Sequence, residues 1–445
     1  MEYVPPWKEP YFIAIAGCSG SGKTSVSSWI IQKLNVPWTI ILSMDNFYRE
    51  LTNEQRALAF ESNWDFDSPD AIDFDLAIEV LQSIKKGKKT DVPNYSFTEH
   101  KRTDRTTIIY GANIVILEGI YALYDKRVLD LVDLKIFVQE DYDVCMARRL
   151  HRDILHRGRE LRLSIKQWER FVKPNFIRNI QPTEKEADII VPNGVENKIA
   201  LNLLLTHIRL RLKTKSAQHL AELAKLGRNC DQDVRDLVRL PQYSTQLNGI
   251  HTILLDAKTS RADFIFYFNR MADILVSLAL ETVFESSVES KTVTTPTKRQ
   301  FKGLYLPFDK VCAVTMIRGG ECFESALKAS IPTLSLGRLL IQRNTKTGEP
   351  ELHISRLPPI ITEGCSELKV LLTDAQILSG AAAVMAVQIL VDHGVQQQNI
   401  VFIVYSSSEI GIRRLHAAFP EISVVVGRVS PSILSSDYDR CYYGT

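Results

Sequence analysis

Short apolar runs rich in Val, Ile and Leu recur along the first half of the chain, separated by stretches with helical spacing. Strands that alternate with helices in this way are typical of a parallel sheet with helices on both faces, so we predict an α/β domain. The strands are expected at residues 12–16, 39–42, 114–117, 134–138 and 188–191, and two of the helices at 23–34 and 141–156.

The alternation restarts in the second half of the chain. A helical run at 198–213 leads into a polar stretch at 214–239 that lacks strand signals. We interpret this stretch as a linker, and the alternative is a further surface helix of the first domain. The second set of strands is expected at 312–315, 369–373, 399–404 and 423–426. The predicted division is an N-terminal extension at 1–10, a domain at 11–212, a linker at 213–240 and a second α/β domain at 241–445.

The 445 residues are 45% hydrophobic and 24% charged, with a formal net charge of +2. This balance is typical of a soluble globular protein and gives no overall field that favours nucleic acid or an acidic membrane as a partner. The seven cysteines form no CxxC pair and no zinc-like spacing, so we expect reduced thiols. No signal-peptide pattern opens the chain, and the apolar run at 377–390 is too short for a bilayer. We expect a cytoplasmic protein, with the nucleus as an alternative.

The first expected strand runs directly into a sequence that matches GxxxxGK[ST] and opens a helix. Small residues let successive backbone N–H groups surround phosphates there, and the helix N-terminus adds a favourable dipole. In such a loop the lysine reaches the transferred phosphate and the Thr24 hydroxyl binds Mg²⁺. We predict a site for ATP or GTP with Mg²⁺. Its residues are Gly17, Cys18, Ser19, Gly20, Ser21, Gly22, Lys23, Thr24 and Ser25.

Carboxylates follow the next two expected strands. Asp45 comes after 39–42, where it faces the phosphates and can accept a proton from an acceptor hydroxyl, although an aspartate there could also only cap a turn. Glu118 comes after 114–117 and is placed to hold the hydration shell of Mg²⁺. The basic segment at 147–159 is either a solvated helix face or a lid that neutralises charge on a transferred phosphoryl group, and the phosphate loop favours the lid.

Five further motifs follow the phosphate loop. They are Ser43-Met44-Asp45-Asn46-Phe47-Tyr48, Phe66-Asp67-Ser68-Pro69-Asp70-Ala71, Pro93-Asn94-Tyr95-Ser96-Phe97-Thr98-Glu99-His100, Leu117-Glu118-Gly119-Ile120 and Phe171-Val172-Lys173-Pro174. With these motifs in this order, residues 11–210 resemble the uridine/cytidine kinase family of P-loop kinases. The resemblance implies that Asp45 is the base for the ribose 5′-hydroxyl. It also implies that Asp67 binds the ribose hydroxyls with the help of Arg149 and Gln167.

The same resemblance assigns the remaining contacts. Tyr95 and His100 would read the edge of a pyrimidine, where the pocket leaves no room for a purine. Arg159, with Arg157 nearby, would bridge nucleoside and phosphates, and Glu196 would lie near the adenine. The predicted catalytic residues are Asp45, Lys23, Arg149 and Arg159. The family also implies a homotetramer that is regulated by pyrimidine nucleotides.

Residues 241–445 resemble uracil phosphoribosyltransferase, a type I phosphoribosyltransferase fold. The matching stretches are Gly249-Ile250-His251-Thr252-Ile253-Leu254, Ser260-Arg261-Ala262-Asp263-Phe264-Ile265-Phe266-Tyr267, Lys291-Thr292-Val293-Thr294-Thr295-Pro296 and Tyr443-Gly444-Thr445. Arg318, Arg343 and Asp374 fall where that family binds phosphoribosyl pyrophosphate. Two ligand-binding loops of that family have lost glycines in this sequence: the phosphoribosyl loop at 374–382 and the uracil loop at 431–439. These glycines let the backbone approach the ligand closely. We therefore expect a retained fold without catalysis.

The leading hypothesis is an ATP-dependent kinase that converts uridine and cytidine to UMP and CMP. Its second domain would regulate the kinase or assemble the oligomer. Three alternatives stay open. The protein could also make UMP from uracil, it could phosphorylate another hydroxyl such as that of pantothenate, or it could be a non-catalytic nucleotide-sensing scaffold. Lys23, Thr24, Asp45 and Glu118 argue against the scaffold, whereas Tyr95 and His100 argue against a different hydroxyl.

Overall fold

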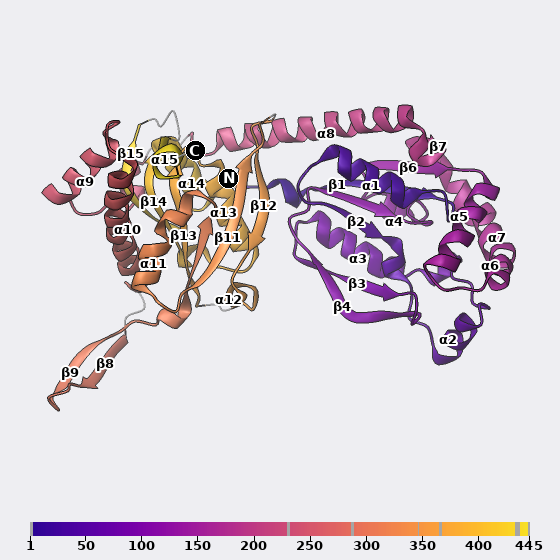
Figure 1. The fold of residues 1–445 in the computed structure, drawn as a ribbon, viewed down its shortest axis with the longest axis horizontal. Coiled ribbons are helices and arrows are strands. Elements are labelled where there is room, and N and C mark those ends of the chain that lie inside the picture. The colour runs from indigo at the N-terminus through magenta and orange to yellow at the C-terminus, as the bar shows by residue number, and fades with distance from the viewer. Residues whose placement is uncertain are drawn as a thin grey trace. The chain divides into compact units, whose positions relative to one another are not determined.

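The computed structural model describes residues 3–228, 232–285, 289–345, 347–364, 367–431 and 437–443. The chain forms two compact units, which we call the N-terminal unit (Pro5–Ser216) and the C-terminal unit (Met1–Val4 with Ala217–Thr445). The long helix α8 (Lys198–Lys225) runs through the boundary between them (Figure 1). Residues 214–225, which we interpreted as the start of a linker, therefore continue a helix. They are rich in Ala, Leu, Lys, Glu and Gln, which favour helix.

A parallel five-stranded sheet in the order β2-β5-β1-β6-β7 forms the centre of the N-terminal unit. The sequence predicted all five strands. Successive side chains of β1 point to opposite faces, so Ile13 packs on α1 and α8 whereas Phe12 joins the core on the other face. The strands are β1 (Tyr11–Gly17), β2 (Thr39–Ser43), β5 (Ile114–Glu118), β6 (Leu134–Gln139) and β7 (Ile189–Pro192). The helices are α1 (Lys23–Leu34), α2 (Asn53–Phe60), α3 (Phe74–Lys85), α4 (Lys126–Leu129), α5 (Tyr142–Leu155), α6 (Leu161–Gln167), α7 (Lys173–Asn175) and α8.

An antiparallel hairpin in the same unit was not predicted. It consists of β3 (Thr90–Ser96) and β4 (Lys101–Ile109), and most of its residues are at least partly exposed. Such strands lack the continuous apolar run that marks a buried parallel strand, which explains why the pattern missed them. His100 ends the turn between them with a positive φ of 49°. The hairpin matters because it carries two of the predicted substrate-binding residues.

The C-terminal unit is built on a six-stranded sheet in the order β12-β11-β10-β13-β14-β15. All neighbouring strands are parallel except β11 and β12. The four predicted strands correspond to β10, β13, β14 and β15, and β11 and β12 were not predicted. The strands are β10 (Val311–Met316), β11 (Ser335–Arg343), β12 (Pro350–Arg356), β13 (Lys369–Ile377), β14 (Ile400–Ser408) and β15 (Ser423–Ser430). The helices are α9 (Thr245–Leu255), α10 (Arg261–Phe284), α11 (Glu324–Ser330), α12 (Pro359–Thr362), α13 (Ala381–Asp392), α14 (Glu409–Ala418) and α15 (Asp437–Tyr443).

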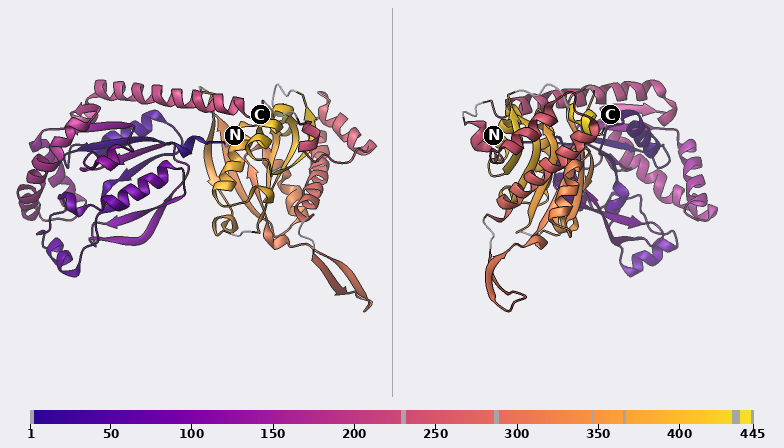
Figure 2. Two further views of the ribbon diagram at one scale, coloured as in Figure 1. Left: turned by 180° about the vertical axis from the view of Figure 1, so that it is seen from behind. Right: turned by 60° about the vertical axis from the view of Figure 1, so that its left-hand side comes forward.

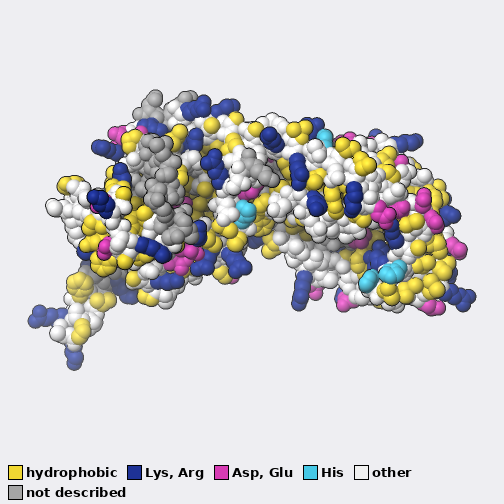
Figure 3. Space-filling view, turned by 45° about the horizontal axis from the view of Figure 1, so that its top comes forward, with side chains coloured by type: hydrophobic (Ala, Val, Ile, Leu, Met, Phe, Trp, Pro, Cys, Tyr) yellow, Lys and Arg dark blue, Asp and Glu magenta, His cyan; other side chains and the backbone are white. Residues whose placement is uncertain are grey.

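A two-stranded hairpin of β8 (Glu289–Thr294) and β9 (Gln300–Tyr305) extends from the body of the C-terminal unit in each view of Figures 1 and 2. Lys and Arg side chains cover its outer end (Figure 3). Among the described residues, no helix combines the length and the hydrophobicity that a membrane crossing needs.

Candidate active site

The loop between β1 and α1 has the shape of a phosphate cradle. Gly20 has a φ of 91°, and a Cβ atom there would lie 2.3 Å from the carbonyl oxygen of Cys145, so only glycine fits. Lys23 opens α1 and its ammonium donates to the carbonyl oxygens of Gly17 (3.1 Å) and Cys18 (2.8 Å). The lysine is thereby held beside the loop whose backbone N–H groups would surround phosphates.

Glu118 ends β5, which pairs with β1 and so brings its carboxylate to the start of α1. The carboxylate accepts hydrogen bonds from the hydroxyls of Thr24 (3.0 Å) and Ser27 (3.4 Å). Burial raises the pKa of Glu118, and the Thr24 hydrogen bond and the charge of Lys23 act against that rise. Carboxylate and hydroxyl oxygens are ligands that Mg²⁺ prefers, so this pair fits the predicted metal site. Ser27, one helical turn after Lys23, was not predicted.

Asp45 lies on the 3₁₀ turn Met44–Phe47, directly after β2. Burial raises the pKa of Asp45, while the positive charges of Arg157, Lys23 and Arg152 oppose the rise. A carboxylate whose pKa lies above its ordinary value is a better proton acceptor for a hydroxyl group. The position after β2 and the raised pKa both agree with the predicted role of Asp45 as a general base.

One cavity of about 310 Å³ connects these groups. This volume is in the range of pockets that hold small ligands. The predicted residues that line it are Ser19, Gly20, Gly22, Lys23, Thr24, Ser25, Asp45, Asp67, Tyr95, His100, Glu118, Arg149, Arg157, Arg159 and Gln167. Tertiary structure thus brings segments together that are more than a hundred residues apart in the sequence.

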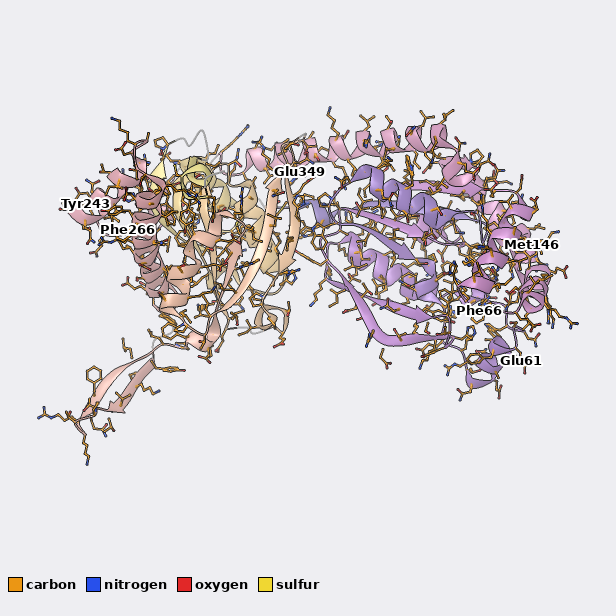
Figure 4. All side chains as sticks on the ribbon, in the orientation of Figure 1. Glu61, Phe66, Met146, Tyr243, Phe266 and Glu349 are labelled. Atoms are coloured by element: carbon orange, nitrogen blue, oxygen red, sulfur yellow. The ribbon has the colours of Figure 1, made fainter. Side chains whose placement is uncertain are left out.

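Aromatic side chains also line this cavity. The His100 ring stacks on Phe66, with 5.0 Å between the ring centroids and 20° between the ring planes (Phe66 is labelled in Figure 4). Burial, assisted by the charge of Arg159, lowers the pKa of His100, so the neutral ring offers one donor and one acceptor. The Tyr95 hydroxyl is buried without a hydrogen-bond partner among the described residues, and burial raises its pKa to about 12. A flat slot with these groups fits a planar heterocycle.

A buried ion pair lies in the wall of the same cavity. Both carboxylate oxygens of Asp67 accept hydrogen bonds from Arg149, at 3.2 and 3.3 Å. The guanidinium of Arg159 donates to the side-chain oxygen of Gln167 at 3.1 Å. The four residues predicted to bind ribose and phosphates are therefore held in two hydrogen-bonded pairs.

The basic segment predicted as a lid consists of the second half of α5 and the loop after it. Arg157 lies over the ring of Phe97, with 4.3 Å between the guanidinium carbon and the ring centroid. Arg148 and Arg152, which the sequence placed in the lid segment without a separate role, also line the cavity. Arginine side chains from this one segment therefore face the space between the phosphate loop and the aromatic slot.

The C-terminal unit places two of the three predicted phosphoribosyl residues close together. Asp374 lies on β13, and a Cβ atom on Gly319 would lie 2.1 Å from its Oδ1, so the turn that begins after Arg318 touches this carboxylate. Arg343 ends β11, where its Nε donates to the carbonyl oxygen of Gly348 at 3.1 Å. Arg318 follows β10 and Arg343 ends β11, at the carboxyl edge where ligands bind in open α/β sheets, whereas Asp374 lies within β13.

The two loops that we expected to be degenerate differ in how far they are described. The phosphoribosyl loop enters α13 through Gly380, and the carbonyl oxygen of Ser379 accepts a hydrogen bond from Arg414 at 2.8 Å. In the uracil loop, residues 432–436 lie outside the described residues, as does the C-terminal pair 444–445 of the matching stretch at 443–445. Tyr438 is described, and its ring is buried against Phe268 with 5.0 Å between the ring centroids.

Comparison with known proteins finds a matching family for each of the two units. The sequence matches the Phosphoribulokinase / Uridine kinase family over residues 12–200 and Uracil phosphoribosyltransferase over residues 242–439. A uridine kinase of Saccharomyces cerevisiae is 47% identical over 96% of this chain and 85% of its own length. The chain belongs to the uridine kinase family. Two further members have similar coverage. A uridine kinase of Schizosaccharomyces pombe is 38% identical over 99% of this chain and 97% of its own length. A uridine-cytidine kinase-like 1 of Mus musculus is 40% identical over 96% of this chain and 78% of its own length.

Membership confirms the two resemblances, the α/β fold class and the expectation of a phosphotransferase. Of the residues predicted for the kinase site, Gly17, Cys18, Ser21 and Glu196 do not line the cavity, and of these Glu196 alone lies outside the phosphate loop. Glu196 ends the turn Gly194–Glu196, its side chain is exposed, and its carboxylate lies 3.8 Å from the guanidinium of Arg148. It is not among the residues that line the cavity, so its expected place near the adenine remains a prediction.

Sequence reasoning also missed two groups that the fold brings to the site. The indole of Trp64 lines the cavity, and its N–H is buried without a partner among the described residues. Asp153 is completely buried beneath the basic segment. A signal for Asp153 was present in the sequence, because it is the acid between Arg152 and Arg157 in an otherwise basic run.

Proposed function

We propose that the protein transfers the terminal phosphoryl group of ATP or GTP to the 5′-hydroxyl of uridine and cytidine, producing UMP and CMP for pyrimidine salvage. The observation that carries the proposal is the single cavity in which Lys23 and Thr24 of the phosphate loop, the Asp45 carboxylate and the His100–Tyr95 slot meet. The names of the relatives, uridine kinase and uridine-cytidine kinase-like 1, support the same acceptor.

The acceptor is held by groups of matching chemistry. The flat slot beside Phe66 takes the pyrimidine ring, and neutral His100 and the free hydroxyl of Tyr95 supply hydrogen bonds to its polar edge. Asp67 accepts hydrogen bonds from the ribose hydroxyls while Arg149 keeps the carboxylate oriented. A purine has a second ring, and the aromatic walls exclude it sterically.

The transfer itself uses Asp45 and the cationic groups around it. The 5′-hydroxyl gives its proton to Asp45 as its oxygen bonds to the γ-phosphorus, and the bond from this phosphorus to the β,γ-bridging oxygen breaks, releasing ADP or GDP. Lys23 and the arginines of the lid, among them Arg159, stabilise the charge that spreads over the transferred group. Thr24 and Glu118 would hold Mg²⁺, which when bound neutralises charge on the triphosphate.

We propose that the C-terminal unit is a phosphoribosyltransferase fold without that catalytic activity and that it serves in regulation or assembly. Tyr438 supports this, because a large buried ring stands in the sequence region where the related enzymes leave bare backbone. The carbonyl of Ser379 in the phosphoribosyl loop is already bonded to Arg414. A homotetramer is proposed from the resemblance alone, and light scattering of the purified protein tests it.

A nucleoside panel tests the main proposal. Uridine, cytidine, adenosine, guanosine and thymidine are incubated separately with Mg²⁺ and either ATP or GTP, and monophosphates are quantified by mass spectrometry. We expect UMP and CMP with at least one donor, and no purine monophosphate. Absence of both products from folded protein that binds ATP would overturn the proposal.

A further inference from the structure

The acid beneath the lid connects arginines that would otherwise repel one another. Asp153 lies on α5 with an exposed fraction of 0%, and its two carboxylate oxygens are shared among four guanidiniums. The distances from Asp153 are 2.9 Å to Arg152, 3.4 Å to Arg159, 3.5 Å to Arg149 and 3.6 Å to Arg157. The backbone carbonyl of Asp153 also accepts the N–H of Arg159 at 3.0 Å, which ties the loop to the end of the helix.

The four arginines do not depend on this acid equally. Arg149 has a second partner, since it also pairs with Asp67. For Arg152, Arg157 and Arg159, Asp153 is the only carboxylate within ion-pair distance in the described part of the chain. These three side chains line the cavity, whereas Asp153 does not. One buried negative charge therefore lies behind three positive charges that border the cavity.

Burial by itself raises the pKa of Asp153, but the charges of the four guanidiniums outweigh that effect and lower it. The surrounding guanidiniums therefore favour the ionised carboxylate. Guanidiniums at such short separations repel one another, and without a shared counter-ion they would move apart towards solvent. Transition-state stabilisation needs charges that are already in place before the reaction begins.

We propose that Asp153 is a positioning residue, whose carboxylate holds Arg152, Arg157 and Arg159 together so that they face the phosphoryl group in transfer. The proposal rests on the kinase function proposed above. Asp153 touches neither substrate nor the reacting atoms and acts through the arginines. Its loss should therefore reduce the rate of the chemical step more than it weakens binding of the nucleoside, because Arg149 keeps both hydrogen bonds to Asp67.

Two variants of the full-length protein test this. Asp153→Asn removes the charge and preserves the shape, and we expect kcat to fall about 10–100-fold, less than the 10²–10³-fold that follows removal of a stabilising donor itself. Asp153→Glu keeps the charge but displaces the carboxylate by one methylene group, so we expect a loss of about 3–10-fold. In both, KM for uridine and for ATP should stay within about threefold of the wild-type values. The matched control is Asp143→Asn, an exposed aspartate on the same helix, which should change none of these constants.

A double-mutant cycle separates positioning from a merely structural role. If Asp153 acts through Arg157, the kcat loss of the Asp153→Asn, Arg157→Gln double variant should be at least about threefold smaller than the product of the two single losses. Multiplicative losses would overturn the proposal, as would a kcat of Asp153→Asn within twofold of wild type. Should Asp153→Asn not fold, Asp153→Glu decides, and full activity of that variant assigns Asp153 to stability alone. Failure of the proposed function looks different, because wild type and Asp143→Asn would then also lack kinase activity.

Discussion

Replacing Asp45 by asparagine preserves the size and shape of the side chain but removes its ability to accept a proton. Asp45 is partly buried, and burial raises its pKa against the opposing charges of Arg157, Lys23 and Arg152. A positioned general base contributes about 10²–10⁴ in rate, which corresponds to about 2.7–5.5 kcal/mol of activation free energy. We expect kcat of the Asp45→Asn variant to fall by that factor. The affinity for ATP should stay within about threefold or increase slightly, because the variant removes a negative charge near the phosphate loop.

The assay combines steady-state kinetics with a direct measurement of ATP binding by calorimetry. Asp70→Asn, an exposed aspartate in the turn Pro69–Ala71, is the matched control and should behave as wild type. The pH dependence gives a second test. The base must be ionised, so wild-type kcat should be lost as the pH falls through the pKa of Asp45, which lies above its ordinary value, and this limb should be absent from the variant. Near-normal turnover of Asp45→Asn would remove this residue from the mechanism.

Three further predictions address the acceptor site and the two units. His100→Ala should raise KM for uridine and cytidine far more than KM for ATP, since the ring lies in the acceptor slot beside Phe66, and equal effects on both substrates would indicate a role in folding. A fragment that ends at Ser216 should retain kinase activity, because every residue proposed for the chemistry lies in the N-terminal unit; a folded but inactive fragment would mean that the C-terminal unit completes the site. The full-length protein should form no UMP from labelled uracil, phosphoribosyl pyrophosphate and Mg²⁺, and formation at a rate comparable to the kinase reaction would establish a bifunctional enzyme.

The sequence by itself determined the local parts of this protein. A phosphate loop is made by consecutive residues at the junction of one strand and one helix, so its spacing specifies the geometry without help from distant segments. The same holds for the alternation that identified the five strands of the N-terminal sheet. Asp45 and Glu118 were recognised because each follows an apolar run, and the carboxyl ends of parallel strands meet at one edge of a sheet.

Only the tertiary structure decided which of these residues meet. The order β2-β5-β1-β6-β7 places β5 between β2 and β1, and this brings Glu118 to Thr24 and Ser27 across a separation of about ninety residues. The exposed hairpin that carries Tyr95 and His100 has no apolar period, so its strands were not predicted, although the motif at 93–100 assigned both residues to the pocket by resemblance. The arrangement of the lid arginines around Asp153 is likewise a property of the fold, because the direction of each guanidinium depends on where the loop after α5 turns back onto the helix. Local spacing determines which chemical groups are available, whereas strand order and side-chain burial determine which of them act together.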